Sequence, residues 1–199
     1  YTSNNYDFNY IPGTLVISQT SLQFTLSNIN TMYNGLVQGV NPNNLIVTEG
    51  ASGNPVNIED IIDYITFEYK NSLGEIVNPK NVGTYTITIY FNGNDAYEPT
   101  EHHGNNITIN PRPITVAQST IHYYNATIQT VYLTINNKVD GDDVEAYVVD
   151  STANAGTRDN MTVVLSGSDK DNYVLVDETT SITISPRPVT ITFDNQIQI

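Results

Sequence analysis

The chain has 199 residues, enough for one mid-sized domain or for two domains of about 100 residues each. Its 21 acidic and 7 basic residues give a formal net charge of -14, which disfavours nucleic acid and anionic membranes as partners. No Cys is present, which excludes disulfides, thiolate nucleophiles and Cys-ligated metals. The 22 Ile, 18 Val, 25 Thr and 14 Tyr far outnumber the 7 Ala and 9 Leu, and this excess of β-branched and aromatic residues predicts an all-β protein.

An internal repeat organises the chain. The segment Ile107-Thr-Ile-Asn-Pro-Arg-Pro-Ile-Thr-Val116 recurs 75 residues later as Ile182-Thr-Ile-Ser-Pro-Arg-Pro-Val-Thr-Ile191, and Leu15-Val-Ile-Ser18 is a fainter copy. Other landmarks keep their order between these junctions: Met32-Tyr-Asn-Gly35 matches Tyr123-Tyr-Asn-Ala126, and Asn81-Val-Gly-Thr84 matches Asn154-Ala-Gly-Thr157. The repeat therefore predicts four segments: C-terminal strands of a preceding repeat (1–18), a first β-repeat domain (19–111), a second (112–187) and the first strand of a following repeat (188–199).

Within each repeat the hydrophobic period is mostly two, which is typical of half-buried strands. In the first repeat the expected strands are 21–26, 45–49, 65–70, 84–91 and 106–110. In the second they are 114–117, 130–135, 144–149, 161–165, 173–176 and 181–185. Five short strands in the first repeat and six in the second favour two tandem immunoglobulin-like β-sandwich repeats.

One segment of the first repeat differs from this pattern. Asn57-Ile-Glu-Asp-Ile-Ile-Asp-Tyr64 has an Asn cap, early acidic residues and apolar spacings of three and four, which indicate a short helix or helical turn. If that helix packs on a sheet, a β-grasp-like unit is the alternative fold for the first repeat.

The Pro-Arg-Pro junctions carry a structural prediction of their own. Pro111 and Pro186 cannot donate to a strand ladder, and each proline biases its predecessor to extended backbone. We expect the strand before each junction to leave its sheet there. Because such a crossing is extended and stiff, successive domains should meet in a restricted geometry.

These motifs carry a resemblance to a known family. A resemblance is carried by Tyr-Asn-Gly, Gly141-Asp-Asp-Val144, Asn-x-Gly-Thr, the Asp-x-Asn-Tyr-like Asp169-Lys-Asp-Asn-Tyr173 and the closing Ile-Thr-Ile-x-Pro-Arg-Pro, which resemble the MBG and YDG-type repeats of large bacterial surface adhesins. Residues 112–187 resemble the YDG type most, whereas 19–111 resemble it mainly at both ends. The resemblance implies an extracellular, tandemly repeated β-domain at a bacterial cell surface, and it brings no catalytic or ligand residues. Ala126 departs from the Gly of the family turn.

The sequence predicts no metal or cofactor site. His102 and His103 are adjacent, so in a strand they would face opposite sides, and an exposed turn is expected instead; His122 is expected on a strand surface. Two acidic clusters, listed by sequence, are Asp140, Asp142, Asp143 and Glu145, and Asp169, Asp171, Asn172, Asp177 and Glu178. Because neither cluster has EF-hand spacing, both are interpreted as solvated turns in which Asp and Asn cap the backbone. The alternative is an inter-domain calcium clamp.

No catalytic residues are predicted either. Glu59, Asp60, Asp63 and Glu68 supply carboxylates, but nothing around them indicates the aromatic pocket that glycoside hydrolysis needs. Tyr85, Tyr147 and Tyr173 are expected to be core or corner residues, and Tyr97, Tyr123 and Tyr124 to be exposed. A further hypothesis is an isopeptide bond from Lys70, Lys80, Lys138 or Lys170, if one of them lies in a core.

The functional expectation is therefore not an enzyme but a rigid, extracellular stalk or spacer of a bacterial cell-surface adhesin, with neighbouring repeats of the same chain as partners. The alternative is an adhesive module that binds mucin, another host glycan or a matrix protein through tyrosine-bearing loops. No apolar run exceeds four residues, so no transmembrane helix and no direct membrane insertion is expected in this stretch.

Overall fold

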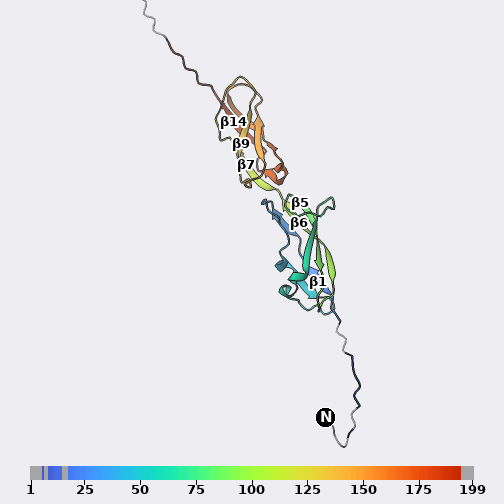
Figure 1. Ribbon diagram of the computed structural model, residues 1–199. Coiled ribbons are helices and arrows are strands. Elements are labelled where there is room, and N and C mark those ends of the chain that lie inside the picture. The colour runs from blue at the N-terminus through green and yellow to red at the C-terminus, as the bar shows by residue number, and fades with distance from the viewer. Residues whose placement is uncertain (1–5, 7–8, 15–17, 194–199) are drawn as a thin grey trace, which may run out of the picture. The chain divides into compact units, whose positions relative to one another are not determined.

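The computed structural model describes residue 6, residues 9–14 and residues 18–193 (Figure 1). In the first repeat the strands are β1 (Leu22–Thr25), β2 (Ile29–Met32), β3 (Ile46–Glu49), β4 (Ile65–Lys70), β5 (Gly83–Phe91) and β6 (Thr100–Asn110). In the second they are β7 (Arg112–Ala117), β8 (His122–Tyr123), β9 (Thr130–Asn136), β10 (Glu145–Val149), β11 (Gly156–Thr162), β12 (Val164–Ser166), β13 (Tyr173–Leu175) and β14 (Thr179–Ser185). The helical residues among those described form 3-10 turns: η1 (Pro42–Asn44), η2 (Ile58–Asp60), η3 (Ile62–Tyr64) and η4 (Lys170–Asn172). The predicted all-β class is confirmed.

The chain forms two compact units. Of the described residues, unit 1 holds those up to Ser27 together with Val40–Glu68 and Ile87–Asn105. Unit 2 holds Asn28–Gly39, Tyr69–Thr86 and the residues from Asn106 onward. The unit limits cut across the sequence repeats, and the four predicted segments stay a prediction. Part of the segment 1–18, including most of the faint repeat copy, and residues 194–199 lie outside the described residues.

The two repeats share a pattern of strand pairing. β1 pairs antiparallel with β3, as β7 does with β9. β2 runs parallel to the end of β6, as β8 runs parallel to the end of β14. β5 neighbours β6, as β11 neighbours β14. β4 is the edge strand next to β5, and β13 is the edge strand next to β7. The repeat seen in the sequence thus corresponds to a repeated pairing scheme.

The cores follow the alternation of the strands. In β5 every second side chain is buried, namely Tyr85, Ile87, Ile89 and Phe91, and Phe91 lies 6.2 Å from Phe24 between ring centroids. The second repeat has a core cluster made of Val131, Leu133, Ala146, Val148, Val163, Ile182 and Ile184. Each buried Val, Leu, Ile or Phe side chain among them contributes about 1.5–3 kcal/mol by leaving water, so without disulfides the described parts are held by apolar burial and strand hydrogen bonds.

The sheet exchange predicted at the first junction is confirmed. β6 ends at Asn110 in a sheet with β2, β5 and β4, whereas β7 begins at Arg112 in a sheet with β9 and β13. Pro111 stands between them and has no N–H to give to either ladder. After the second junction, residues 186–193 belong to no strand. A strand is defined by its pairing, so the predicted strand at 188–199 stays untested.

Two local predictions can be compared with the structure. Asn57 caps η2 by accepting from the Glu59 N–H, as predicted, and the segment forms the 3-10 turns η2 and η3, which confirms the helical turn. No described residue there supplies the helix that a β-grasp-like unit needs. The single strand expected at 161–165 is wrong, because β11 and β12 belong to different sheets and the buried Val163 separates them.

Candidate functional site: a socket and an acidic face in unit 2

Tyr33 comes directly after β2 and is the most deeply buried tyrosine, with 1% of its surface exposed. Its backbone N–H donates to the Asn110 carbonyl over 2.9 Å, which continues the parallel pairing of β2 with β6. Its ring stands edge-on against Tyr173, with 5.6 Å between centroids. A tyrosine that the sequence places in a turn motif is thus a core residue whose cover comes from the second repeat.

Asp142 satisfies the hydroxyls of both tyrosines. Its Oδ2 accepts from Tyr33 Oη over 2.8 Å and from Tyr173 Oη, and Tyr173 Oη in turn accepts from the Val139 N–H over 3.0 Å. Hydrogen bonds to an ionised acceptor are stronger than neutral ones, and buried hydroxyls need them. Burial raises the pKa of both tyrosines, and the hydrogen bond and charge of Asp142 raise it further, to about 12 for Tyr173 and higher for Tyr33.

Arg112, the centre of the first Pro-Arg-Pro junction, joins the same group. Its Nε and Nη2 donate to the carbonyl and side-chain oxygens of Asn137, each over 2.7 Å, and its Nη1 donates to the Tyr33 carbonyl over 3.4 Å. Asn137 also donates from Nδ2 to the Pro113 carbonyl over 2.8 Å. The planar guanidinium therefore fixes the junction in one orientation by several bonds at once.

Asn172 makes a second polar link. It is buried, and its Oδ1 accepts from the Val82 N–H over 2.9 Å. Beside it, Tyr85 donates from Oη to the Asn81 carbonyl over 2.7 Å. Here the Asn-x-Gly-Thr motif of the first repeat meets the Asp-x-Asn-Tyr motif of the second.

We call Tyr33, Val82 and Arg112 the first socket, and Asn137, Asp142, Asn172 and Tyr173 the acidic face; all of them belong to unit 2. Recurring motifs of the sequence supply Tyr33, Val82, Arg112, Asn172 and Tyr173, whereas Asp142 comes from the single Gly-Asp-Asp motif and Asn137 from none of them. The group contains aromatic packing, one carboxylate with both of its tyrosine donors, and a cation held by amide oxygens. Such a closed set of partners can hold two segments of the chain together. Because both tyrosine hydroxyls donate to the Asp142 carboxylate, this carboxylate is occupied by hydrogen bonds and is not placed to transfer a proton.

The acidic clusters are capped turns only in part: Asp143 and Asp169 follow the prediction, whereas Asp142 binds two tyrosine hydroxyls, Glu145 lies in β10 and Asn172 is buried. Asp143 accepts at Oδ2 from the N–H and the hydroxyl of Ser168 over 2.9 and 3.0 Å, which lowers the pKa of Asp143. Asp169 Oδ2 accepts from the Asp143 N–H over 2.8 Å. Across the described part of the chain, no three His, Asp or Glu side chains are grouped in a way that could hold a metal ion. The calcium clamp stays an untested alternative.

The histidine prediction is partly wrong. His102 and His103 lie in β6 and not in an exposed turn, because β6 extends through a polar stretch that lacks apolar alternation. His102 is half-buried and bonds to Asn105 Oδ1 over 2.9 Å, whereas the exposed His103 lies 3.2 Å from Thr88 Oγ1. His122 lies in β8, as predicted.

The other predicted residues divide by burial. Tyr85 and Tyr173 are core residues, as predicted, and Tyr147 is half-buried against Tyr132. Tyr123 and Tyr124 are exposed, as predicted, but Tyr97 is half-buried because it bridges to Thr20. Glu59, Asp60 and Asp63 are exposed and Glu68 is half-buried; Lys80, Lys138 and Lys170 are exposed and Lys70 is half-buried in β4. The three exposed lysines do not lie in a core, which was the premise of an isopeptide bond.

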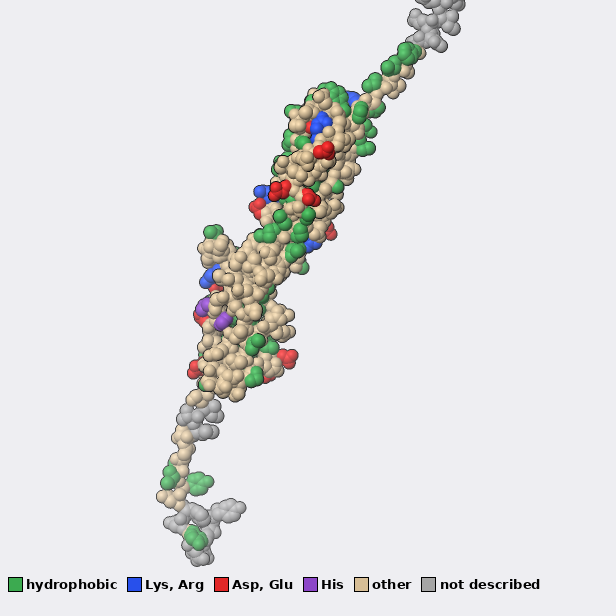
Figure 2. All heavy atoms as spheres, turned by 180° about the vertical axis from the view of Figure 1, so that it is seen from behind, with side chains coloured by type: hydrophobic (Ala, Val, Ile, Leu, Met, Phe, Trp, Pro, Cys, Tyr) green, Lys and Arg blue, Asp and Glu red, His purple; other side chains and the backbone are tan. Residues whose placement is uncertain are grey.

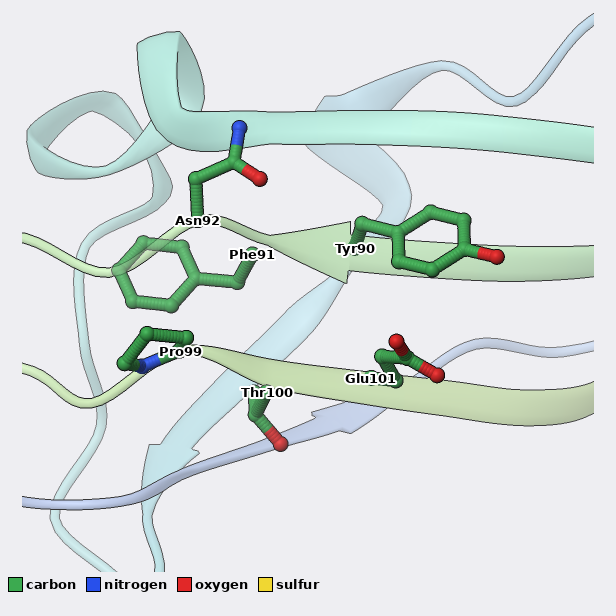
Figure 3. A pocket seen from close by; sticks show the side chains of 6 residues that line it. All are labelled: Tyr90, Phe91, Asn92, Pro99, Thr100 and Glu101. Carbon is green, nitrogen blue, oxygen red and sulfur yellow. The ribbon is translucent and has the colours of Figure 1, made fainter.

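Unit 1 carries an open hollow of about 380 Å³ between the ends of β5 and β6. Figure 3 shows Tyr90 and Phe91 at the end of β5, followed by Asn92, and Thr100 and Glu101 at the start of β6, preceded by Pro99, with the Phe91 ring beside Pro99. Phe91 is buried at 2% exposure, so it belongs to the core beneath the hollow. The lining contains one carboxylate, Glu101, and no second acid for general acid and base catalysis.

The surface is dominated by uncharged polar groups. In Figure 2 most of the described surface is tan, and the red carboxylates are scattered rather than gathered into one patch. No helix among the described residues is both long and apolar enough to span a membrane.

The role of Tyr33 and Arg112 was missed in the sequence. The available signal was that two recurring motifs contain a side chain that a turn does not need, namely the Tyr of Tyr-Asn-Gly and the Arg of Pro-Arg-Pro. Comparison with known proteins adds no relative, because no family model fits the chain and no curated protein or solved structure is significantly similar to it.

Proposed function

We propose that this chain consists of two immunoglobulin-like β-sandwich repeats that serve as a rigid, non-enzymatic spacer in the stalk of a bacterial cell-surface adhesin, outside the cell. The observation that carries the proposal is the closed group formed by the first socket and the acidic face, in which Asp142 binds two tyrosine hydroxyls and Arg112 binds Asn137. A spacer must transmit orientation from one repeat to the next. Aromatic packing and several directed bonds across one junction supply that function.

Further support comes from composition and resemblance. A Cys-free chain needs no oxidation to fold, and a net charge of -14 opposes self-association, both of which suit a protein exposed outside a cell. The motifs that resemble MBG and YDG-type repeats are the same ones that build the first socket and the acidic face. The family resemblance and the geometry therefore support the same function.

Rotational diffusion measured by 15N relaxation tests the spacer. We expect residues of β5 and residues of β9 to report one common correlation time in the native chain, and separate, shorter times after Tyr33→Ala. Tyr124→Ala is the matched control, since that tyrosine is exposed. Independent tumbling in the native chain would overturn the proposal.

The second candidate is an adhesive module for mucin, another host glycan or a matrix protein. It is supported by Tyr123, which is 50% exposed and lines an open hollow of about 470 Å³ with Asn125 and Pro188. Tyrosine rings can stack on sugars. A mucin and glycan array, run with calcium and again with EDTA, tests it: saturable binding that Tyr123→Ala abolishes supports adhesion, and dependence on calcium would support the calcium clamp.

A further inference from the structure

We infer that Tyr124, Ala155 and Arg187 form a second socket, which binds the acidic face of another repeat of the same kind as residues 112–187. The inference rests on the proposed function and names the surface through which one more repeat would be held. Its basis is a comparison inside this chain. Each residue of the second socket occupies the position that a residue of the first socket occupies one repeat earlier.

The backbone establishes the equivalence of the tyrosines. Tyr33 follows β2, which runs parallel to the end of β6, and its N–H donates to the Asn110 carbonyl over 2.9 Å. Tyr124 follows β8, which runs parallel to the end of β14, and its N–H donates to the Ser185 carbonyl over 2.8 Å. Asn110 and Ser185 are 75 residues apart, the offset of the repeated junction. The two tyrosines therefore leave the same point of the same strand pairing.

The surroundings of the two tyrosines differ. Tyr33 is 1% exposed because Tyr173 and Asp142 cover it, whereas Tyr124 is 37% exposed. Ala155 stands where Val82 stands one repeat earlier, and it is exposed too. The second socket thus presents the same aromatic ring and the same kind of backbone edge, but without the cover that Tyr173 and Asp142 give to Tyr33.

The arginines show the same contrast. Arg112 follows Asn110 by two residues and is bonded to Asn137, and Arg187 follows Ser185 by two residues. Arg187 is exposed and has no hydrogen bond or ion pair within the part of the chain that the structure describes. Two open hollows, of about 420 and 470 Å³, are both lined by Tyr124 and Arg187.

Charge identifies the occupant. The second socket offers two donor groups, the Tyr124 hydroxyl and the Arg187 guanidinium, which has no partner among the described residues, in a chain with only 7 basic residues. The acidic face offers what they need: the carboxylate of Asp142, the amide oxygen of Asn137 and the edge of the Tyr173 ring. A repeat that carries this face fits the second socket by the contacts already made at the first.

One residue makes the second socket more selective. At Gly35 a Cβ would come within 2.7 Å of Val139 Cγ1, so the first socket has room for Val139 only because residue 35 is Gly. The equivalent residue is Ala126, which keeps the left-handed backbone with φ of 65°. The second socket therefore favours a repeat with a residue smaller than Val at position 139, or a copy of this chain after Ala126→Gly.

The experiment extends the chain. Residues 1–187 carrying Ala126→Gly are followed directly by a second copy of residues 113–199, and tyrosine nitration by tetranitromethane is mapped by peptide mass spectrometry. We expect Tyr124 to be nitrated readily in the native chain and at least about tenfold more slowly in the extended chain. Asp142→Asn in the added copy should restore nitration of Tyr124, as should Arg187→Ala. Tyr33 is the internal standard and should stay protected throughout.

The outcomes separate the inference from the proposed function. Circular dichroism shows whether the added copy is folded. If it is folded and Tyr124 is nitrated as fast as in the native chain, the second socket is overturned. Continued protection of Tyr33 in the same sample would leave the spacer proposal standing. An added copy that folds only behind a Gly-Ser linker of about 12 residues would overturn it too, because directly joined repeats could then not occupy the two faces. Rapid nitration of Tyr33 in the native chain would overturn both the second socket and the proposed spacer function. Saturation of Tyr124 protection by mucin but not by the added copy would assign the surface to a glycan instead.

Discussion

The first and second sockets start from the same strand pairing and end in opposite environments. Tyr33 is buried under Tyr173 and bound to Asp142, whereas Tyr124, which has the same backbone partner one repeat later, is 37% exposed. The comparison teaches that the recurring motifs do not only mark turns. A motif tyrosine is a surface residue of its own repeat, and it becomes a core residue when the acidic face of another repeat covers it.

The largest expected effect is the loss of Tyr33. Tyr33→Ala removes a buried ring and leaves Asp142 short of a donor, and we expect the free energy of unfolding to fall by about 3–5 kcal/mol. The matched substitution Tyr124→Ala should cost less than about 1 kcal/mol, because that ring is already partly in water. Urea denaturation of both variants measures the difference. Equal losses would mean that burial at the first socket does not stabilise the protein.

The second largest expected effect is the loss of the Asp142 carboxylate. Asp142→Ala leaves the hydroxyls of Tyr33 and Tyr173 without their shared acceptor, and we expect a loss of about 2–3 kcal/mol. Asp140→Ala is the control, since Asp140 is exposed and two residues away, and it should change stability by no more than about 0.5 kcal/mol. Urea midpoints at matched protein concentration give the two values. A similar loss in both variants would indicate that general charge, not the two bonds, is responsible.

Alkaline pH should open the same junction. The pKa of Tyr173 rises from 10.0 in the unfolded chain to about 12, chiefly by burial and then by the hydrogen bond to Asp142, and Tyr33 shifts in the same direction. A raised folded-state pKa contributes stability that is complete below the unfolded value and is lost as pH rises through the folded value. We therefore expect Tyr173 alone to lower the free energy of unfolding by about 2 kcal/mol between pH 10 and pH 12, and Tyr33 to add to that loss.

Tyrosinate absorbance and urea titration across this pH range measure the alkaline effect. Tyr124→Phe removes one phenol from the absorbance amplitude but should leave the pH dependence of the free energy of unfolding unchanged. Asp142→Asn removes the charge that opposes tyrosinate formation, so it should move the transition to lower pH. An unchanged transition in Asp142→Asn would contradict the assignment of the shift to that carboxylate.

The sequence predicts the framework of these sites better than their contacts. Alternation of buried and exposed residues located most of the strands, and the proline at 111 located the exchange between sheets, because both depend on local stereochemistry. Tyr173 was expected in a core for the same reason. Asp142 was interpreted only as a turn residue, since its partner Tyr33 is 109 residues away and nothing local encodes that pairing. The strand β2 was missed because its four residues pair in parallel with a distant strand.

A smaller effect compares the two turns after these strands. Gly35 has φ of 78° and faces Val139, so Gly35→Ala adds both left-handed strain and a close contact, and we expect a loss of about 2 kcal/mol. Ala126 already holds φ of 65°, so Ala126→Gly relieves strain and should stabilise by roughly 0.5 kcal/mol after the entropy of Gly is counted. Thermal unfolding of the two variants checks these opposite signs. Two losses of equal size would show that the turns are not equivalent.

The smallest effect distinguishes the two neighbouring carboxylates of the Gly-Asp-Asp motif. Asp142 binds tyrosines, whereas Asp143 accepts from the N–H and hydroxyl of Ser168, and these bonds hold the pKa of Asp143 below its ordinary 3.8. A lowered folded-state pKa contributes stability that is present above pH 3.8 and is lost as pH falls through the folded value, so acid should loosen this turn.

Carbon NMR titration of the Asp143 carboxyl tests that last prediction. Ser168→Ala should move its pKa upward, because one of the two donors is removed while the backbone N–H remains. The same titration bears on calcium. A carboxylate already occupied by two donors from its own turn must lose them before it binds a cation, so we expect saturating calcium to leave the Asp143 titration unchanged. A calcium-induced shift, accompanied by a higher melting temperature, would instead assign the acidic turn to a calcium clamp and would make Asp143, not Asp142, the residue through which that face binds its ligand.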